Sequence, residues 1–219
     1  MTEMVGKRQL NRARKREAIV EIATRAFFCN GYAATSMSAI ADELGGSKAT
    51  LWAHFSSKED LFAAVIDREI ESFSALLTPT LVDREFSLPA LRQAAISFLE
   101  CLLRPSSVQL YRVILSECER FPEISEMFYS RGPLKMRAAM IDFFKTSFPE
   151  DVATRCARLL ITGISGYRSD ILIRPDKPSA ADRAFFIEQL IAAIIPTAPI
   201  DGMTEARGSQ PLSQPNATA

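Results

Sequence analysis

The sequence predicts an all-α protein of about nine helices. In almost every segment after residue 12, apolar residues recur at helical period, and no stretch alternates apolar and polar residues as a strand would. Serine precedes several of these segments, and glycine or proline follows them, as expected at helix ends. With 219 residues, 47% apolar and 24% charged, the composition is typical of a globular protein.

Each of the first four predicted helices is bounded by a residue that caps or ends a helix. Serine caps a helix because its side chain accepts from a free backbone N–H, and glycine ends one because it adopts the left-handed conformation. Glu59 and Asp60, early in the fourth helix, favour its start. The first helix ends at Asn30-Gly31, and the second extends from Ser36 to Gly45-Gly46. The third extends from Ser47 to about His54, and the fourth from Ser57 to about Leu77, before Pro79.

The rest of the chain predicts about five further helices separated by prolines. The third of them has a candidate break at Gly132-Pro133. After Pro196 the chain is rich in Pro, Gly, Ser, Thr and Gln, which predicts a disordered tail. The helices span roughly Leu88–Arg104, Ser107–Arg120, Ile124–Phe148, Asp151–Arg174 and Ala180–Ile195.

Composition excludes several classes of protein. The four cysteines are scattered and there is one histidine, so we predict no metal site, no disulfide framework and no cofactor. No apolar run reaches the length of a membrane span, and the N-terminus lacks the apolar stretch of a signal peptide, so a cytoplasmic protein without a membrane partner is expected. The net charge is zero, but residues 1–16 hold six basic residues against one acidic residue. Such a basic arm can bind DNA while the acidic body stays away from it.

Residues 36–54 predict a helix-turn-helix, with two short helices joined by a tight turn that contains glycine. In such a unit the second short helix lies in the major groove and the first crosses the DNA backbone. Hydroxyl groups, lysine ammonium groups and helix N-terminal amides in this segment can contact phosphate. Spacing alone leaves other possibilities open: a three-helix unit that never contacts DNA, solvated lysines at 48 and 58, and a partly buried Trp52.

The segment GYAATSMSAIADELGGSKATLWAHFSSKEDLFAAVI resembles the DNA-binding domain of the tetracycline-repressor (TetR) family, over about residues 14–75. The resemblance implies that Ser36 and Lys58 contact phosphate and that the helix from Ser47 is the recognition helix. Ala39, Gly46 and Trp52 depart from the family pattern. The resemblance implies a small core of Ile40, Ala41, Leu44, Leu51, Phe55 and Leu61. The DNA contacts that we expect are Ser36, Met37, Ser47, Lys48, Ala49, Thr50, Trp52, His54 and Lys58.

The same resemblance implies that the last two long helices form a four-helix bundle with a second subunit. A homodimer would place two recognition helices about one turn of DNA apart, which predicts a palindromic operator. Small residues at 163, 166 and 169 allow a close helix approach, either across the dimer or within one subunit. The dimer contacts that we expect are Leu160, Gly163, Tyr167, Phe186, Leu190 and Ile194.

The segment from Leu110 to Pro133 resembles the ligand domain of a large AefR-like subgroup of the family. We therefore expect a small-molecule effector of unknown identity to bind among the C-terminal helices. Each candidate can also be ordinary core, and an ion pair of Arg112 with Glu117 or Glu119 is the favoured alternative for that residue. The candidate ligand contacts are Phe98, Leu102, Tyr111, Arg112, Phe128, Met136, Phe143 and Tyr167.

These observations together predict a ligand-responsive transcription regulator, most simply a repressor, that binds double-stranded DNA as a homodimer. The helix from Ser57, the only continuous connection between the two domains, is expected to tilt as a lever when the effector binds. An activator and a ligand-independent architectural protein are the alternatives; no catalytic constellation is present, so an enzyme is not expected. The expected divisions are a basic flexible arm (1–13), the helix-turn-helix DNA-binding domain (14–60), a connecting helix (61–78), the ligand-binding and dimerisation domain (79–196) and the tail (197–219).

Overall fold

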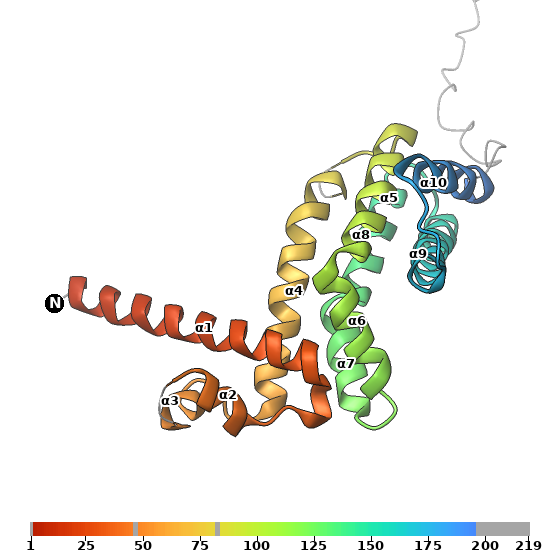
Figure 1. Cartoon of the computed structure of the whole chain (residues 1–219). Coiled ribbons are helices and arrows are strands. Elements are labelled where there is room, and N and C mark those ends of the chain that lie inside the picture. Colours follow the sequence, from red (N-terminus) through yellow and green to blue (C-terminus); the bar gives the residue numbers. More distant parts are fainter. Residues whose placement is uncertain (1, 46–47, 82–83, 196–219) are drawn as a thin grey trace, which may run out of the picture.

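The computed structural model describes residues 2–45, 48–81 and 84–195, which form ten α-helices and no strand (Figure 1). The predicted all-α class is therefore confirmed. No helix in these ranges is long and apolar enough to cross a membrane. The helices are α1 (Thr2–Ala34), α2 (Met37–Glu43), α3 (Lys48–Trp52), α4 (Lys58–Leu81), α5 (Leu88–Leu103), α6 (Pro105–Glu117), α7 (Pro122–Arg131), α8 (Pro133–Lys145), α9 (Glu150–Ile173) and α10 (Ala180–Ile194).

Two predicted boundaries differ from those of the structure, and one predicted break is confirmed. The segment expected as a flexible arm over 1–13 is helical from Thr2 onwards, as the first turns of α1. The candidate break at Gly132-Pro133 in the segment 124–148 is confirmed, because α7 ends at Arg131 and α8 starts at Pro133, which has no backbone N–H. α4 continues through Pro79 to Leu81, whose side chain is buried in the protein core. The predicted tail over 197–219 lies outside the described residues.

The helices bury two separate apolar clusters. The first, called here the N-terminal core, combines buried residues of α1 to α4 with Leu110, Val113 and Ile114 of α6 and Ile124 of α7. The second, the C-terminal core, combines the last turns of α4 with α5, α8, α9 and α10. In Figure 1, α4 rises from the end that carries α2 and α3 to the end that carries α5, with α6 and α7 beside its lower half. α4 therefore contributes side chains to both cores.

Candidate nucleic-acid interface

The two short helices α2 and α3 are fixed to the N-terminal core by their apolar sides. Ile40, Ala41, Leu51, Phe55 and Leu61 are all at most 3% exposed, and Leu44 is half-buried. Ser36 caps α2, with its Oγ accepting from the backbone N–H of Ala39 at 3.2 Å. The core predicted beneath the helix-turn-helix is therefore confirmed, and it determines which face of α3 is left at the surface.

The outward face of α3 carries side chains suited to a DNA groove. Lys48, Ala49 and Trp52 are exposed, with 52% of Trp52 accessible, which favours an outward indole over a core one. Ser36 is also exposed, while Thr50 and His54 are half-buried. Met37 is half-buried against the N-terminal core, so its thioether packs inward. Ser47 lies outside the described residues.

Basic residues of α1 lie close to the end of α3. The Arg16 guanidinium stands 4.9 Å from the centroid of the Phe55 ring. Burial lowers the pKa of His54, and the positive charges of Arg12, Lys15 and Arg16 lower it further. In Figure 1 the N-terminal half of α1 extends above α2 and α3. Positive charge therefore lies beside the C-terminal end of α3, where a phosphate backbone would neutralise it.

Lys58 has a different position from the one the sequence suggests. Its ammonium group donates to the carbonyl oxygens of Tyr32 at 2.8 Å, Thr35 at 3.0 Å and Ala33 at 3.3 Å, and lies 4.3 Å from the Tyr32 ring centroid. An ammonium has three N–H donors, and these carbonyls take all three. Lys58 therefore closes the C-terminal end of α1, and its predicted phosphate contact stays a prediction.

The end of α1 is also held by two carboxylates. The α1 helix breaks at Gly31, whose φ of 80° lies in the left-handed region that glycine tolerates best. The Tyr32 hydroxyl donates to Glu59 Oε1 at 2.9 Å, and the Ala33 backbone N–H donates to Glu117 Oε1 of α6, also at 2.9 Å. The turn that orients α2 is thus connected both to α4 and to α6.

The predicted dimer residues mostly pack within one chain. Leu160 is fully buried and Ile194 is 8% exposed, so both side chains pack within the chain, and the dimer contacts predicted for them stay predictions. The Tyr167 and Phe186 rings stack at 3.8 Å, and a Cβ on Gly163 would lie 2.8 Å from Leu190 Cδ1. The exposed apolar side chains on α9 and α10 are instead Leu159 (44%), Ile173 (84%) and Phe185 (66%).

The predicted ligand contacts are not brought together in one place. Phe98 and Phe143 are buried in the C-terminal core, where Leu102 and Met136 also pack, whereas Phe128 packs against the N-terminal core. Arg112 is exposed and, among the described residues, forms no ion pair with Glu117 or Glu119, so the favoured pairing is also wrong. Tyr167 stacks on Phe186 within the subunit. Tyr111 is the one predicted ligand contact whose ring faces a buried charged group.

That group is Arg168, which the sequence interpretation missed. It is 6% exposed, and its guanidinium carbon lies 3.5 Å from the Tyr111 ring centroid. Burial lowers the pKa of this guanidinium. The available signal was its position on α9, where Ile164 and Ile171 place it on the apolar face of the helix.

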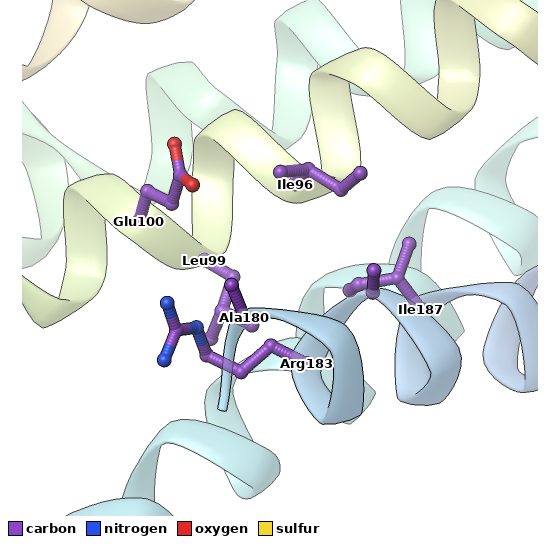
Figure 2. A pocket seen from close by; sticks show the side chains of 7 residues that line it. Ile96, Leu99, Glu100, Ala180, Arg183 and Ile187 are labelled. Atoms are coloured by element: carbon purple, nitrogen blue, oxygen red, sulfur yellow. The ribbon is translucent and has the colours of Figure 1, made fainter. Parts of the chain in front are cut away.

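A small hollow lies elsewhere, between α5 and α10 (Figure 2). Ile96, Leu99 and Ile187 form its apolar part, with Glu100 on one side and Arg183 on the other, as Figure 2 shows. None of the predicted ligand contacts lines it. Arg183 is already engaged, donating to the carbonyl oxygen of Pro178 at 2.9 Å.

Comparison with known proteins gives two matches to family descriptions. Residues 19–65 match bacterial regulatory proteins of the tetR family, and residues 89–148 match the C-terminal domain of AefR-like transcriptional repressors. These segments contain the helix-turn-helix and the helices α5 to α8, respectively.

Two curated relatives share part of the chain. The chain is 42% identical to the HTH-type transcriptional repressor ComR of Escherichia coli over 60 residues. This segment makes up 27% of this chain and 29% of ComR. Over 106 residues it is 33% identical to the HTH-type transcriptional activator FasR of Mycolicibacterium smegmatis, 48% of each chain. The matched segments thus span less than half of either relative.

Two solved structures resemble nearly the whole fold. The flavonoid-responsive regulator FrrA has a TM-score of 0.70 and 28% identity, covering 83% of this chain and 95% of FrrA. A tetR-family transcriptional regulator from Mesorhizobium loti has a TM-score of 0.67 and 25% identity, covering 84% of this chain and 96% of its own.

Proposed function

The chain belongs to the tetR family of bacterial regulatory proteins, and on that premise we propose that it is a transcription regulator, most simply a repressor. In this proposal it binds a palindromic operator as a homodimer, and a small molecule bound among the C-terminal helices changes its affinity for DNA. The observation that carries the proposal is the face of α3 around Trp52, exposed above a buried base and bordered by the basic residues of α1.

The relatives support both directions of regulation. ComR is named a repressor and the C-terminal match is to AefR-like repressors, which favours repression. FasR is named an activator, which makes activation the second candidate. The name of FrrA states that it responds to flavonoids, which supports a small-molecule effector here without identifying it.

A second copy of the chain has surface available to it. Leu159 and Ile173 of α9 and Phe185 of α10 are large exposed apolar side chains on the two helices that the family resemblance assigns to the dimer. Their burial in a symmetric contact would remove apolar area from water. A dimer of this kind would present two copies of α3 to one DNA duplex.

The test is selection from a random double-stranded DNA library by the full-length protein at about 150 mM salt, where non-specific binding is weak. Enrichment of one palindrome is expected. Trp52→Ala should lower affinity for it at least about tenfold, or about 1.4 kcal/mol, whereas Leu134→Ala, which truncates an exposed residue of α8, should not. Retention without an enriched sequence would favour an architectural protein, and absence of retention would overturn DNA binding by the protein alone.

A further inference from the structure

The guanidinium of Arg168 is a buried positive charge without a carboxylate beside it in the described part of the chain. Its Nε is fully buried and has no partner, and no described residue accepts a hydrogen bond from it or forms an ion pair with it. The one contact that its charge makes is with the face of the Tyr111 ring. The guanidinium therefore retains unused N–H donors inside the protein.

Two other partly buried arginines are compensated. Arg104 donates to the Ser72 hydroxyl at 3.1 Å, and Arg131 forms an ion pair of 3.0 Å with Asp67.

Arg68 Nη1 and Arg137 Nε are, like Arg168 Nε, buried without a partner. Arg68, however, forms an ion pair of 3.4 Å with Glu17, and Arg137 is a more exposed residue than Arg168. Removal of a guanidinium from water without an anionic partner costs more than a cation–π contact returns. Arg168 thus destabilises the ligand-free fold, and an anion bound beside its guanidinium would offset that cost.

We propose that Arg168 binds the anionic group of the effector, a carboxylate carried on a compact apolar body, at the contact between α6 and α9. The inference rests on the proposed function, because it assigns a chemical class to the small molecule. A guanidinium can donate two parallel hydrogen bonds to a carboxylate while one of its faces stays on an aromatic ring. Ile164 and Ile171, one turn away on either side along α9, give the site an apolar surrounding that suits an apolar body.

The position of this pair connects the ligand to the DNA-reading end. Ile164 and Ile171 of α9 belong to the C-terminal core, whereas Leu110 and Val113, beside Tyr111 on α6, belong to the N-terminal core. A carboxylate that draws the guanidinium along the face of the Tyr111 ring changes the contact between the two cores. A ligand at this point can therefore favour one arrangement of α6 over another, as a coupled equilibrium requires.

The experiment is thermal unfolding of the full-length protein with benzoate or hexanoate at about 10 mM, each compared with its neutral amide, benzamide or hexanamide. A carboxylate bound with a Kd of about 1 mM should raise the Tm by about 3 °C more than the amide does. Arg168→Met should abolish that difference and, because it removes an uncompensated charge, should raise the Tm of the ligand-free protein. Arg168→Lys keeps the charge and should retain part of the carboxylate effect.

Lys135→Met, which removes an exposed charge on α8, is the matched control and should leave the carboxylate effect unchanged. Equal effects of carboxylate and amide on the natural protein, or a carboxylate effect that survives Arg168→Met, would overturn the proposal. Operator selection is measured separately. A selected palindrome without a carboxylate effect rejects this inference alone, and a carboxylate effect without DNA retention rejects the proposed function alone.

Discussion

The carboxylate of Glu117 accepts a hydrogen bond of 2.9 Å from the backbone N–H of Ala33. This contact joins the last residue of α6 to the turn between α1 and α2, across a sequence separation of 84 residues. The same carboxylate oxygen would lie 2.9 Å from a Cβ placed on Gly31. α6 is therefore a second connection between the C-terminal helices and the helix-turn-helix, in addition to the continuous α4.

The first prediction concerns this contact. Glu117→Ala should destabilise the fold by about 1–2 kcal/mol, because it leaves the partly buried N–H of Ala33 without an acceptor. Glu117→Gln keeps an amide oxygen at the same place and should recover most of the loss. Urea denaturation measures both. Glu119→Ala, which truncates an exposed carboxylate two residues on, is the control, and an equal loss there would contradict the assignment.

The second prediction separates the two lysines of the helix-turn-helix. Lys58→Met should lower the free energy of unfolding by about 2 kcal/mol, because three carbonyls at the end of α1 lose a charged donor. Lys48→Met, at an exposed position, should change it by no more than about 0.5 kcal/mol. The order should reverse for a DNA contact, with Lys48→Met weakening operator binding in a folded protein. Chemical denaturation measures the free energy of unfolding of both variants, and operator titration measures their DNA affinity. An unchanged free energy of unfolding for Lys58→Met would refute the structural role of Lys58.

The third prediction uses the single histidine of the chain. Burial and the charges of Arg12, Lys15 and Arg16 lower the pKa of His54, so its imidazole should titrate below its usual 6.5. Since the unfolded state then binds the proton more tightly, the contribution of His54 to stability is complete above pH 6.5 and is lost as pH falls through its folded pKa. A phosphate backbone nearby should raise the pKa of His54 again.

Proton NMR can follow this titration directly, because the imidazole gives one Hε1 resonance. Arg16→Gln removes one of the positive charges and should raise the pKa of His54 in the free protein. A free-protein pKa at or above 6.5, or no response to Arg16→Gln, would show that the basic residues of α1 do not act on the end of α3.

The fourth prediction compares two glycines on α9. Gly163→Ala places a Cβ 2.8 Å from the Leu190 side chain, whose end can partly turn away, and should cost about 1 kcal/mol. Gly166→Ala meets nothing within 4 Å and should stabilise the helix by up to about 1 kcal/mol, because alanine has the higher helix propensity. Thermal unfolding at constant protein concentration measures both changes. A stabilising Gly163→Ala would show that α9 and α10 do not pack this closely.

Much of the fold could be predicted because local signals and burial agree. Ser36 and Ser57 accept from the backbone N–H groups of Ala39 and Asp60, as the serine positions indicate. The predicted end of the fourth helix before Pro79 was wrong, because α4 continues to Leu81, and this difference has a physical reason. Leu77 and Leu81, on either side of it, are both buried in the C-terminal core, so burial of the last turn of α4 outweighs one missing backbone hydrogen bond.

The site was less predictable, because its contacts join residues far apart in sequence. The exposed face of Trp52 follows from helical spacing, but the binding of Lys58 to carbonyls 23 to 26 residues away does not. Likewise, Arg168 shows in the sequence only as a basic residue between two isoleucines. Its partner Tyr111 becomes visible when α6 and α9 are brought together.

The shared N-terminal core has a consequence for protein engineering. Leu110, Val113 and Ile114 of α6 and Ile124 of α7 complete a core whose other residues come from α1 to α4. A DNA-reading fragment cut after residue 60 or 78 would leave that apolar surface in water, with an aggregation risk. A hybrid protein that joins α1 to α4 to a foreign sensor domain should therefore keep α6 and α7 with them. Its junctions should be placed at the ends of α5 and α7.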